Sequence, residues 1–303
     1  MKKRNYRYLF GPVASRRLGL SLGVDLVPSK TCTFDCVFCE AGKTIFHTAR
    51  RKEYVPFDAV IKELRDWFSR EQYVDYITLS GAGEPTLYSR FGEVIDFVKA
   101  NSNFKTALLT NSSLFYLPKV RRDATKAGLV KASLSVWNDK LLKKLNQPVL
   151  SLTFDKIMYG LKKFREIFCG DFWLEIMLVD LINSSEEDIH RIKKLTDELK
   201  PDRIQLNTVV RPPAYSFARS VDINLLKKFT TIFMPPAEII GAFTEREKNQ
   251  AIHAKLNIED ITAIVKRRPS RAKDLAIVFG IDEKTITFIL GKFVKDGKLL
   301  ATV

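Results

Sequence analysis

The feature that most constrains this chain is a group of three cysteines within eight positions. Cys32, Cys36 and Cys39 have the spacing C-x3-C-x2-C, and the fourth cysteine, Cys169, stands alone. This arrangement is a poor set for disulfides and indicates a reducing compartment and a metal site. The N-terminus lacks the apolar core of a signal peptide, and no apolar run approaches the roughly 18 residues of a membrane helix. We therefore expect a cytoplasmic protein that does not contact a membrane.

Three kinds of site compete for the clustered thiols. A structural zinc ion takes four ligands, usually in two pairs, and the histidine nearest in sequence is His47. A catalytic thiol needs one cysteine with a basic partner and gains nothing from three. A [4Fe–4S] cluster takes thiolates from one tight loop, and three thiolates leave one iron open for catalysis. We favour one [4Fe–4S] cluster, with Cys32, Cys36 and Cys39 as the metal ligands.

Apolar, β-rich segments alternate with amphipathic helical segments through most of the chain. Strands are expected over 23–28, 73–80, 105–110, 130–137, 172–181 and 203–210. Helices are expected from residue 56, over 91–100, 117–127 and 155–168, and from a cap at 184–187 to about residue 199. This alternation predicts an α/β fold whose parallel sheet curves into a partial (β/α)6 TIM-like barrel over residues 1–244. The glycines and proline of residues 11–19 predict an ordered loop.

Polar residues follow the predicted strands, one group after each. They are the cysteine loop, Gly83-Glu84, Asn111, Ser135 to Asn138, Asn183 and Arg211. Because reactive residues of such barrels lie at the carboxyl ends of the strands, we expect these groups to share one face.

The composition changes near residue 245, and residues 245–303 are expected to form a second, small domain. Helices over 258–266, 270–279 and 283–295, followed by a strand over 298–303, predict a winged helix-turn-helix. The expected core is Leu275, Ala276, Ile281, Ile286, Ile289, Leu290 and Phe293, and the expected exposed face is Glu283, Lys284, Thr287, Lys292 and Lys295. A DNA reader usually places Arg, Asn or Gln where Glu283 lies. We therefore favour docking of substrate, RNA or a protein partner over reading of an operator.

The basic excess of the chain lies around the cysteines. Residues 1–52 hold 11 Lys and Arg against 3 Asp and Glu, a net charge of +8 within the +15 of the whole chain. A basic surface beside a reactive site attracts RNA, phosphates or carboxylates. Solubility without an anionic partner explains the same excess, and both interpretations stay open.

The cysteine spacing, with the aromatic Phe38 before the last cysteine, resembles the signature of the radical SAM superfamily. The Ala82-Gly83-Glu84-Pro85 turn looks like that family's Gly-Gly-Glu element, and the resemblance covers about residues 7–215. Residues 11–19, 21–25, 133–135 and 146–148 are similar to the group that contains the wybutosine-synthesising tRNA enzymes. Those enzymes usually carry extra cysteines for a second cluster, which this sequence lacks.

This resemblance implies a radical SAM enzyme. The open iron would bind the amino and carboxylate groups of S-adenosylmethionine (SAM). An electron from a donor such as a flavodoxin or ferredoxin would cleave SAM to methionine and a 5′-deoxyadenosyl radical, which abstracts hydrogen from the substrate. The resemblance also assigns cofactor contacts: Phe38 near the adenine, Ala82, Gly83 and Glu84 at the SAM ammonium, Asn111 and Ser135 at the carboxylate or ribose, and Met177 and Asn207 along the adenine pocket.

Three hypotheses follow. The leading one is a radical SAM enzyme acting on an anionic macromolecule, with RNA slightly ahead of protein or peptide and no further catalytic residue assigned. The second is an iron–sulfur regulator that binds DNA through the winged helix. The third is a structural zinc module.

Overall fold

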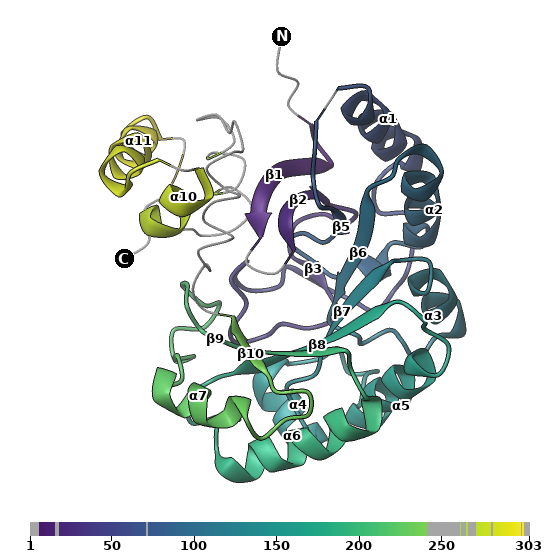
Figure 1. The fold of residues 1–303 in the computed structure, drawn as a ribbon, viewed down its shortest axis with the longest axis vertical. Helices are drawn as coiled ribbons and strands as arrows, with labels where there is room; N and C mark the ends of the chain where they lie inside the picture. The colour runs from purple at the N-terminus through teal and green to yellow at the C-terminus, as the bar shows by residue number, and fades with distance from the viewer. Residues whose placement is uncertain are drawn as a thin grey trace.

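A computed structural model of the chain describes residues 6–15, 18–70, 72–240, 261, 265, 271–279, 281–297 and 299. Eight strands form one sheet in the order β1-β2-β5-β6-β7-β8-β9-β10, and every pair in it except β1 with β2 is parallel. The predicted α/β class with a mostly parallel sheet is therefore confirmed (Figure 1).

The sheet begins with a hairpin where the sequence predicted a loop. Strand β1 (Leu9–Ser15) pairs antiparallel with β2 (Gly19–Val24), and the register shifts between Phe10 and Val13. The loop predicted over 11–19 was wrong. The first strand, predicted over 23–28, exists as β2 but begins at Gly19 and ends at Val24. An edge strand with a bulge accommodates a Gly-Pro pair, which a central strand does not.

The other predicted strands are confirmed, one with the predicted bounds and the rest with bounds that are shorter or shifted. They are β5 (Tyr76–Leu79), β6 (Lys105–Thr110), β7 (Leu129–Ser133), β8 (Asp171–Leu178) and β9 (Arg203–Thr208). The expected helices between them are α1 (Phe57–Phe68), α2 (Phe91–Asn101), α3 (Pro118–Ala124), α5 (Phe154–Arg165) and α6 (Glu186–Leu199). Among the described elements that were not predicted are α4 (Asp139–Leu145), α7 (Ile223–Thr230) and β10 (Glu238–Ile240), a seventh parallel strand.

The two faces of the sheet differ in chemistry. Helices α1, α2, α3, α5 and α6 line its outer side (Figure 1), and Leu108, Val130 and Leu174 belong to the apolar core. The residues that follow these in β7 and β8 include Lys131 and Glu175, which point to the opposite face because side chains alternate along a strand. The inner side of the sheet therefore carries buried polar groups.

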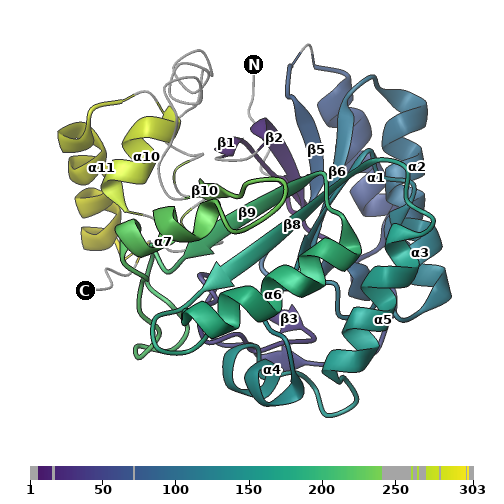
Figure 2. The ribbon, with the colours of Figure 1, turned by 60° about the horizontal axis from the view of Figure 1, so that its bottom comes forward.

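Two helices near the C-terminus lie on the side of β1, away from the outer row of helices (Figure 2). They are α10 (Ala272–Phe279) and α11 (Glu283–Lys295). Leu275 and Ile286 form a small core with Val13 of β1, and Ala276, Ile281, Ile289 and Leu290 pack against it, as expected. Most of the predicted helix 258–266 and strand 298–303, and the boundary near residue 245, lie outside the described residues. No helix within the described ranges is long and apolar enough to cross a membrane.

Candidate functional site

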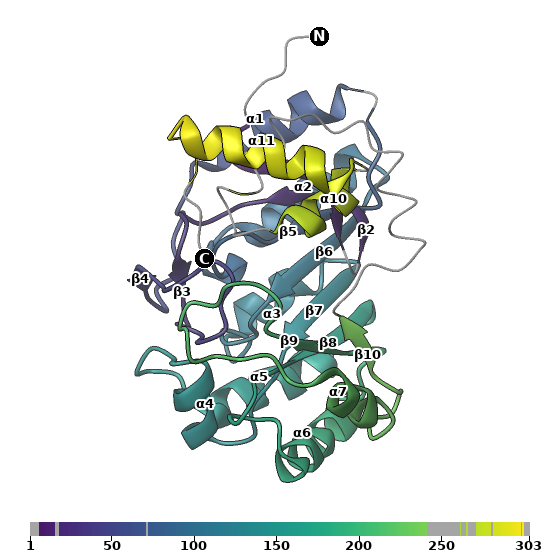
Figure 3. The same cartoon turned by 90° about the vertical axis from the view of Figure 1, so that its left-hand side faces the viewer.

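The predicted site residues lie at one edge of the sheet. Gly83 and Glu84 follow β5, Asn111 follows β6 and Ser135 follows β7, while Met177 and Asn207 lie near the ends of β8 and β9. Because these strands are parallel, their carboxyl ends share that edge. The cysteine segment enters it through β3 (Thr31–Cys32), which pairs with β4 (Phe46–His47) in a separate small sheet (Figure 3).

The three clustered thiols are half-buried neighbours. Burial raises the pKa of the Cys32 thiol to about 12, and the nearby Glu84 carboxyl acts in the same direction. Burial also raises the pKa of Cys36 well above its usual range. The charges of Cys32 and Cys39 raise it further, by a smaller amount. The loop folds back on itself where the Cys39 amide donates to the Cys36 carbonyl at 3.1 Å. The lone Cys169 is exposed.

Two asparagine amides point at the sulfurs. Asn111 Nδ2 lies 3.5 Å from Cys32 Sγ and donates to the Thr33 hydroxyl at 2.8 Å. Asn146 Nδ2 donates to Cys36 Sγ at 3.2 Å. N–H groups directed at a ligating sulfur stabilise its negative charge and tune the cluster that it holds.

Residues far along the chain hold the cysteine loop in place. The Asp35 amide donates to the Gln147 carbonyl at 3.1 Å, and the Tyr215 hydroxyl donates to Asp35 Oδ2 at 2.7 Å. Buried Arg211 forms an ion pair with Glu40, the residue after Cys39, at 2.7 Å. Residues 147, 211 and 215 therefore hold the cysteine loop in position.

The turn after β5 is packed against the cysteine segment. A Cβ on Gly83 would lie 2.2 Å from the Thr31 carbonyl oxygen, so this position requires glycine. The Glu84 amide donates to that same carbonyl at 3.0 Å, and the Ala82 carbonyl accepts from the Lys30 amide at 2.8 Å.

The Glu84 carboxyl is buried and engaged by the protein itself. Its Oε1 accepts from the Thr86 amide at 3.0 Å, the Thr86 hydroxyl at 2.5 Å and the Thr110 hydroxyl at 2.7 Å. Its Oε2 accepts from the main-chain N–H of Asn111 at 2.8 Å. Burial raises the pKa of this carboxyl, and the four donors act in the opposite direction. Glu84 thus links the ends of β5 and β6.

A second group lies at the ends of β7, β8 and β9. The Met177 amide donates to Ser135 Oγ at 2.8 Å, and buried Asn183 donates to the carbonyls of both residues. Asn207 Nδ2 donates to Glu175 Oε1 at 3.2 Å, and Glu175 pairs with Lys131. This buried ion pair lies on the inner face of the sheet.

Phe38 is half-buried and packs against the main core. Its adenine contact and the other predicted cofactor contacts stay predictions. The sequence interpretation missed Asn146 as a partner of Cys36, although the stretch 146–148 was noted for its resemblance. It also missed Thr110 and Tyr215, for which no local sequence signal exists because their roles depend on tertiary contacts.

The donor set suits a cluster better than a single ion. Within the described part of the chain, no three His, Cys, Asp or Glu side chains are arranged to hold one metal ion. His47 Nε2 instead lies 3.1 Å from the Thr33 carbonyl oxygen. A structural zinc needs ligands that converge on one point, whereas each thiolate of a cluster binds a different iron. Neighbouring thiols with amide donors fit the second arrangement.

The sequence matches the radical SAM superfamily over residues 26–195, more than half of its length. This chain belongs to that superfamily. It is 32% identical to a UPF0026 protein of Methanocaldococcus jannaschii over 96% of this chain and 91% of the relative. It is 35% identical to a GTPase Obg of Brachyspira hyodysenteriae over 98% of this chain, but spans only 44% of that relative's length.

Solved structures share the fold at low sequence identity. A radical SAM methyltransferase from Sphaerobacter thermophilus gives a TM-score of 0.58 at 16% identity, covering 72% of this chain and 65% of its own. SuiB of Streptococcus suis bound to S-adenosylmethionine gives 0.54 at 18%, covering 79% and 54%. TYW1 with a lysine-pyruvate adduct gives 0.51 at 14%, covering 72% and 74%. These likenesses concern the fold.

Proposed function

We propose that this chain is a radical SAM enzyme that holds one [4Fe–4S] cluster through Cys32, Cys36 and Cys39 and binds SAM beside it. The observation that carries the proposal is the set of three half-buried thiols with amide donors at Cys32 and Cys36. When bound and reduced, such a cluster would supply the electron that cleaves SAM to methionine and a 5′-deoxyadenosyl radical able to abstract hydrogen from a substrate. A small redox protein such as a flavodoxin or ferredoxin provides the electron.

The protein's own residues position the cofactors and exclude water. Asn111 and Asn146 orient the thiolates of Cys32 and Cys36. Arg211 holds the end of the cysteine loop through its ion pair with Glu40. Because the Glu84 carboxylate already accepts four protein hydrogen bonds, we assign the SAM ammonium to the main-chain carbonyls of the Ala82–Gly83 turn. Glu84 keeps that turn in place.

We assign the remaining SAM contacts to the second group at the strand ends. Ser135 lies at the carboxylate or ribose, Met177 and Asn207 line the adenine pocket, and Phe38 contacts the adenine. The hydrogen bond from Met177 to Ser135 supports one continuous wall.

The architecture that goes with this function is a partial (β/α)6 TIM-like barrel over residues 1–244 and a winged-helix-like domain over 245–303. We infer that the chain is related to the wybutosine-type group, with one cluster, and the resemblance in residues 11–19 and 146–148 supports this inference. The contacts of residues 145–149 with the cysteine loop give that similarity a structural reason.

The substrate that the surface favours is RNA. Lys43, Arg50 and Lys52 are exposed on the segment after Cys39, and the Phe46 ring in its midst is 59% exposed. Basic side chains interleaved with an exposed aromatic ring suit a single-stranded nucleic acid, since phosphates pair with the charges and a base stacks on the ring. A peptide is the competing class, because SuiB was solved with a precursor peptide.

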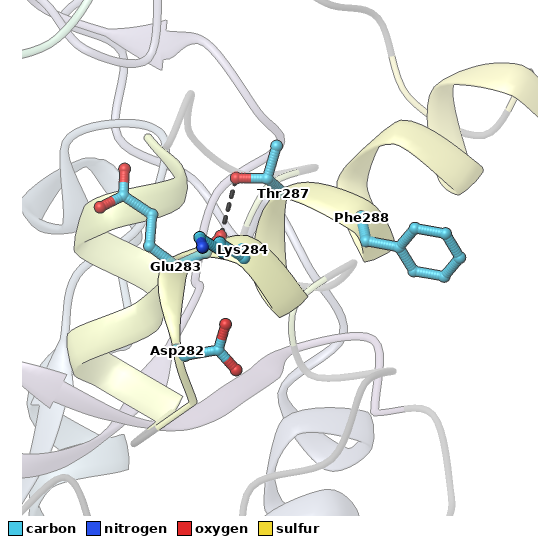
Figure 4. A pocket seen from close by; sticks show the side chains of 5 residues that line it. All are labelled: Asp282, Glu283, Lys284, Thr287 and Phe288. Carbon is cyan, nitrogen blue, oxygen red and sulfur yellow. Dashed lines mark hydrogen bonds between the residues drawn. The ribbon is translucent and has the colours of Figure 1, made fainter.

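The alternative, an iron–sulfur-dependent DNA-binding regulator, has less support. The start of α11 surrounds an open hollow lined by Asp282, Glu283, Lys284, Thr287 and Phe288 (Figure 4). Two carboxylates at that end repel DNA phosphates. We therefore assign the C-terminal domain to docking of substrate or a partner.

Anaerobic reconstitution with iron, sulfide, dithionite and SAM tests the proposal. The wild-type chain is expected to bind about four irons and to release 5′-deoxyadenosine. Cys36→Ala abolishes both, whereas Cys169→Ala, the matched control at the exposed cysteine, changes neither. A chain with a full cluster and no deoxyadenosine contradicts the proposal. RNA that increases the release supports the RNA assignment, and stimulation by peptide alone overturns it.

A further inference from the structure

We propose that Lys30 is the electrostatic partner of the iron–sulfur cluster, and that its ammonium stabilises the cluster's negative charge beside Cys39. The inference rests on the proposed function, because it requires a cluster on the three cysteines. It assigns to one side chain the setting of the cluster's reduction potential.

The first observation is an ammonium group that lacks a hydrogen bond. Among the described residues, Lys30 Nζ is a buried nitrogen with no hydrogen-bond partner. A buried cation is costly unless an anion compensates it. A lysine on a surface loop escapes this cost by extending into water, so the position of Lys30 calls for a nearby negative charge.

The second observation is the place where the ammonium lies. A Cβ on Gly42 would be 2.8 Å from Lys30 Nζ, so the absence of a side chain at Gly42 leaves space for the ammonium group. Burial lowers the pKa of Lys30, while the nearby Cys39 and Asp35 act in the opposite direction. The ammonium is therefore enclosed by the loop that carries the third cysteine.

Two anions act on Lys30, and Asp35 is shared with other donors. Asp35 Oδ1 accepts from the Thr44 amide at 2.6 Å, and Oδ2 accepts from the Tyr215 hydroxyl at 2.7 Å. The second is the sulfur of Cys39, which bears negative charge when it ligates iron, so a cluster adds to the charge that compensates the ammonium.

The third observation is that the main chain of Lys30 is held in an unfavourable conformation. Its φ of 63° lies in the left-handed region, where glycine or asparagine is the usual residue. The Lys30 amide donates to Ala82 at 2.8 Å, and its carbonyl accepts from Ile45 and Phe46, each at 3.0 Å. Because a strained backbone persists only where its surroundings fix it, the side chain is pre-positioned toward the cysteine loop.

The consequence follows from charge alone. One-electron reduction adds one negative charge to the cluster, and a cation held in a low-dielectric loop favours the reduced form. Removal of the Lys30 charge therefore makes the cluster harder to reduce. An exposed charge away from this loop has little effect, because water screens it.

The test is a redox titration of the reconstituted cluster, followed by electron paramagnetic resonance without SAM or turnover. The variants are Lys30→Met, Lys30→Asn, which tolerates the left-handed backbone, and Lys30→Arg, which keeps the charge. Lys62→Met is the control, since it removes an exposed lysine of α1, away from the cysteine loop.

Lys30→Met and Lys30→Asn are expected to lower the equilibrium constant for reduction about tenfold, a shift of about 59 mV to more negative potential. The potentials of Lys30→Arg and Lys62→Met stay near the wild-type value. Loss of the cluster in both uncharged variants, with full iron in Lys30→Arg, supports the same assignment. Equal potentials in all five proteins overturn it, as does an equal shift in Lys30→Arg. A wild-type chain that takes up no iron contradicts the proposed function instead.

Discussion

Replacement of Glu84 by glutamine tests whether this carboxylate holds the site together. Both oxygens of Glu84 accept hydrogen bonds, and the Gln side chain puts an NH2 group where one oxygen was. If the amide oxygen keeps the three donors at Oε1, the NH2 group faces the main-chain N–H of Asn111. The opposite orientation loses more bonds.

The substitution is expected to cost stability in two ways. The hydrogen bond from the Asn111 main-chain N–H is lost, and that N–H then faces the NH2 group of the introduced glutamine side chain without an acceptor between them. One buried unsatisfied group costs about 1–3 kcal/mol, so we expect Glu84→Gln to lower the free energy of unfolding by about 2 kcal/mol. For a domain of this size the melting temperature falls by about 4–8 °C. Because Asn111 also contacts Cys32, iron occupancy after reconstitution falls as well.

Urea unfolding of the iron-free chain and iron analysis of the reconstituted chain measure both effects. Glu187→Gln is the control, since Glu187 is exposed and pairs with Arg191 within one helix. Its effect is expected within about 0.5 kcal/mol. A Glu84→Gln protein that unfolds at the wild-type urea concentration refutes the reasoning.

Three further outcomes are expected. Gly83→Ala places a Cβ 2.2 Å from the Thr31 carbonyl oxygen, so we expect it to lower the free energy of unfolding by about 1–3 kcal/mol and to lower the iron content. Gly128→Ala is the control, because the atom nearest to its Cβ is 3.5 Å away, and it is expected to stay near wild type in both assays. Lys131→Met removes the cation that pairs with buried Glu175, so we expect the free energy of unfolding in urea to fall by about 3–5 kcal/mol. If the double variant Lys131→Met/Glu175→Leu is no more stable than the single variant, the ion-pair explanation is wrong. In the iron-free chain at pH 8, iodoacetamide modifies exposed Cys169 before Cys32, because burial raises the Cys32 pKa to about 12; mass spectrometry showing the reverse order contradicts this.

Much of the architecture could be predicted because it follows from local patterns. Apolar β-rich runs between amphipathic helices identified β5 to β9, and the parallel topology then placed Glu84, Asn111 and Ser135 at one edge. The hairpin at the start was missed because Gly11 and Pro12 indicate a loop, whereas an edge strand with a bulge accepts them. Strand β10 has three residues, too few for a periodic signal.

The details of the site depend on partners that local sequence does not specify. Nothing near Glu84 shows that Thr110 and Asn111 would occupy its carboxylate, because that contact requires β5 and β6 to lie side by side. Likewise, Asn146 and Tyr215 reach the cysteine loop only after the sheet has formed. Prediction from sequence therefore succeeded for the edge of the sheet on which Glu84, Asn111 and Ser135 lie, but did not reach the residues that contact them. The assignment of the three cysteines as metal ligands stays a prediction.

The contacts of the cysteine loop also determine when, during synthesis, the loop can take its final shape. Asn146 lies 110 positions after Cys36, and Tyr215 lies 180 positions after Asp35. At 5–20 residues per second, the ribosome needs roughly 10 to 40 seconds to make the intervening chain. Throughout that interval the nascent polypeptide carries three thiols without the contacts that shape them. If the chain holds the proposed cluster, insertion of iron and sulfur is therefore expected to follow synthesis of the chain through Tyr215.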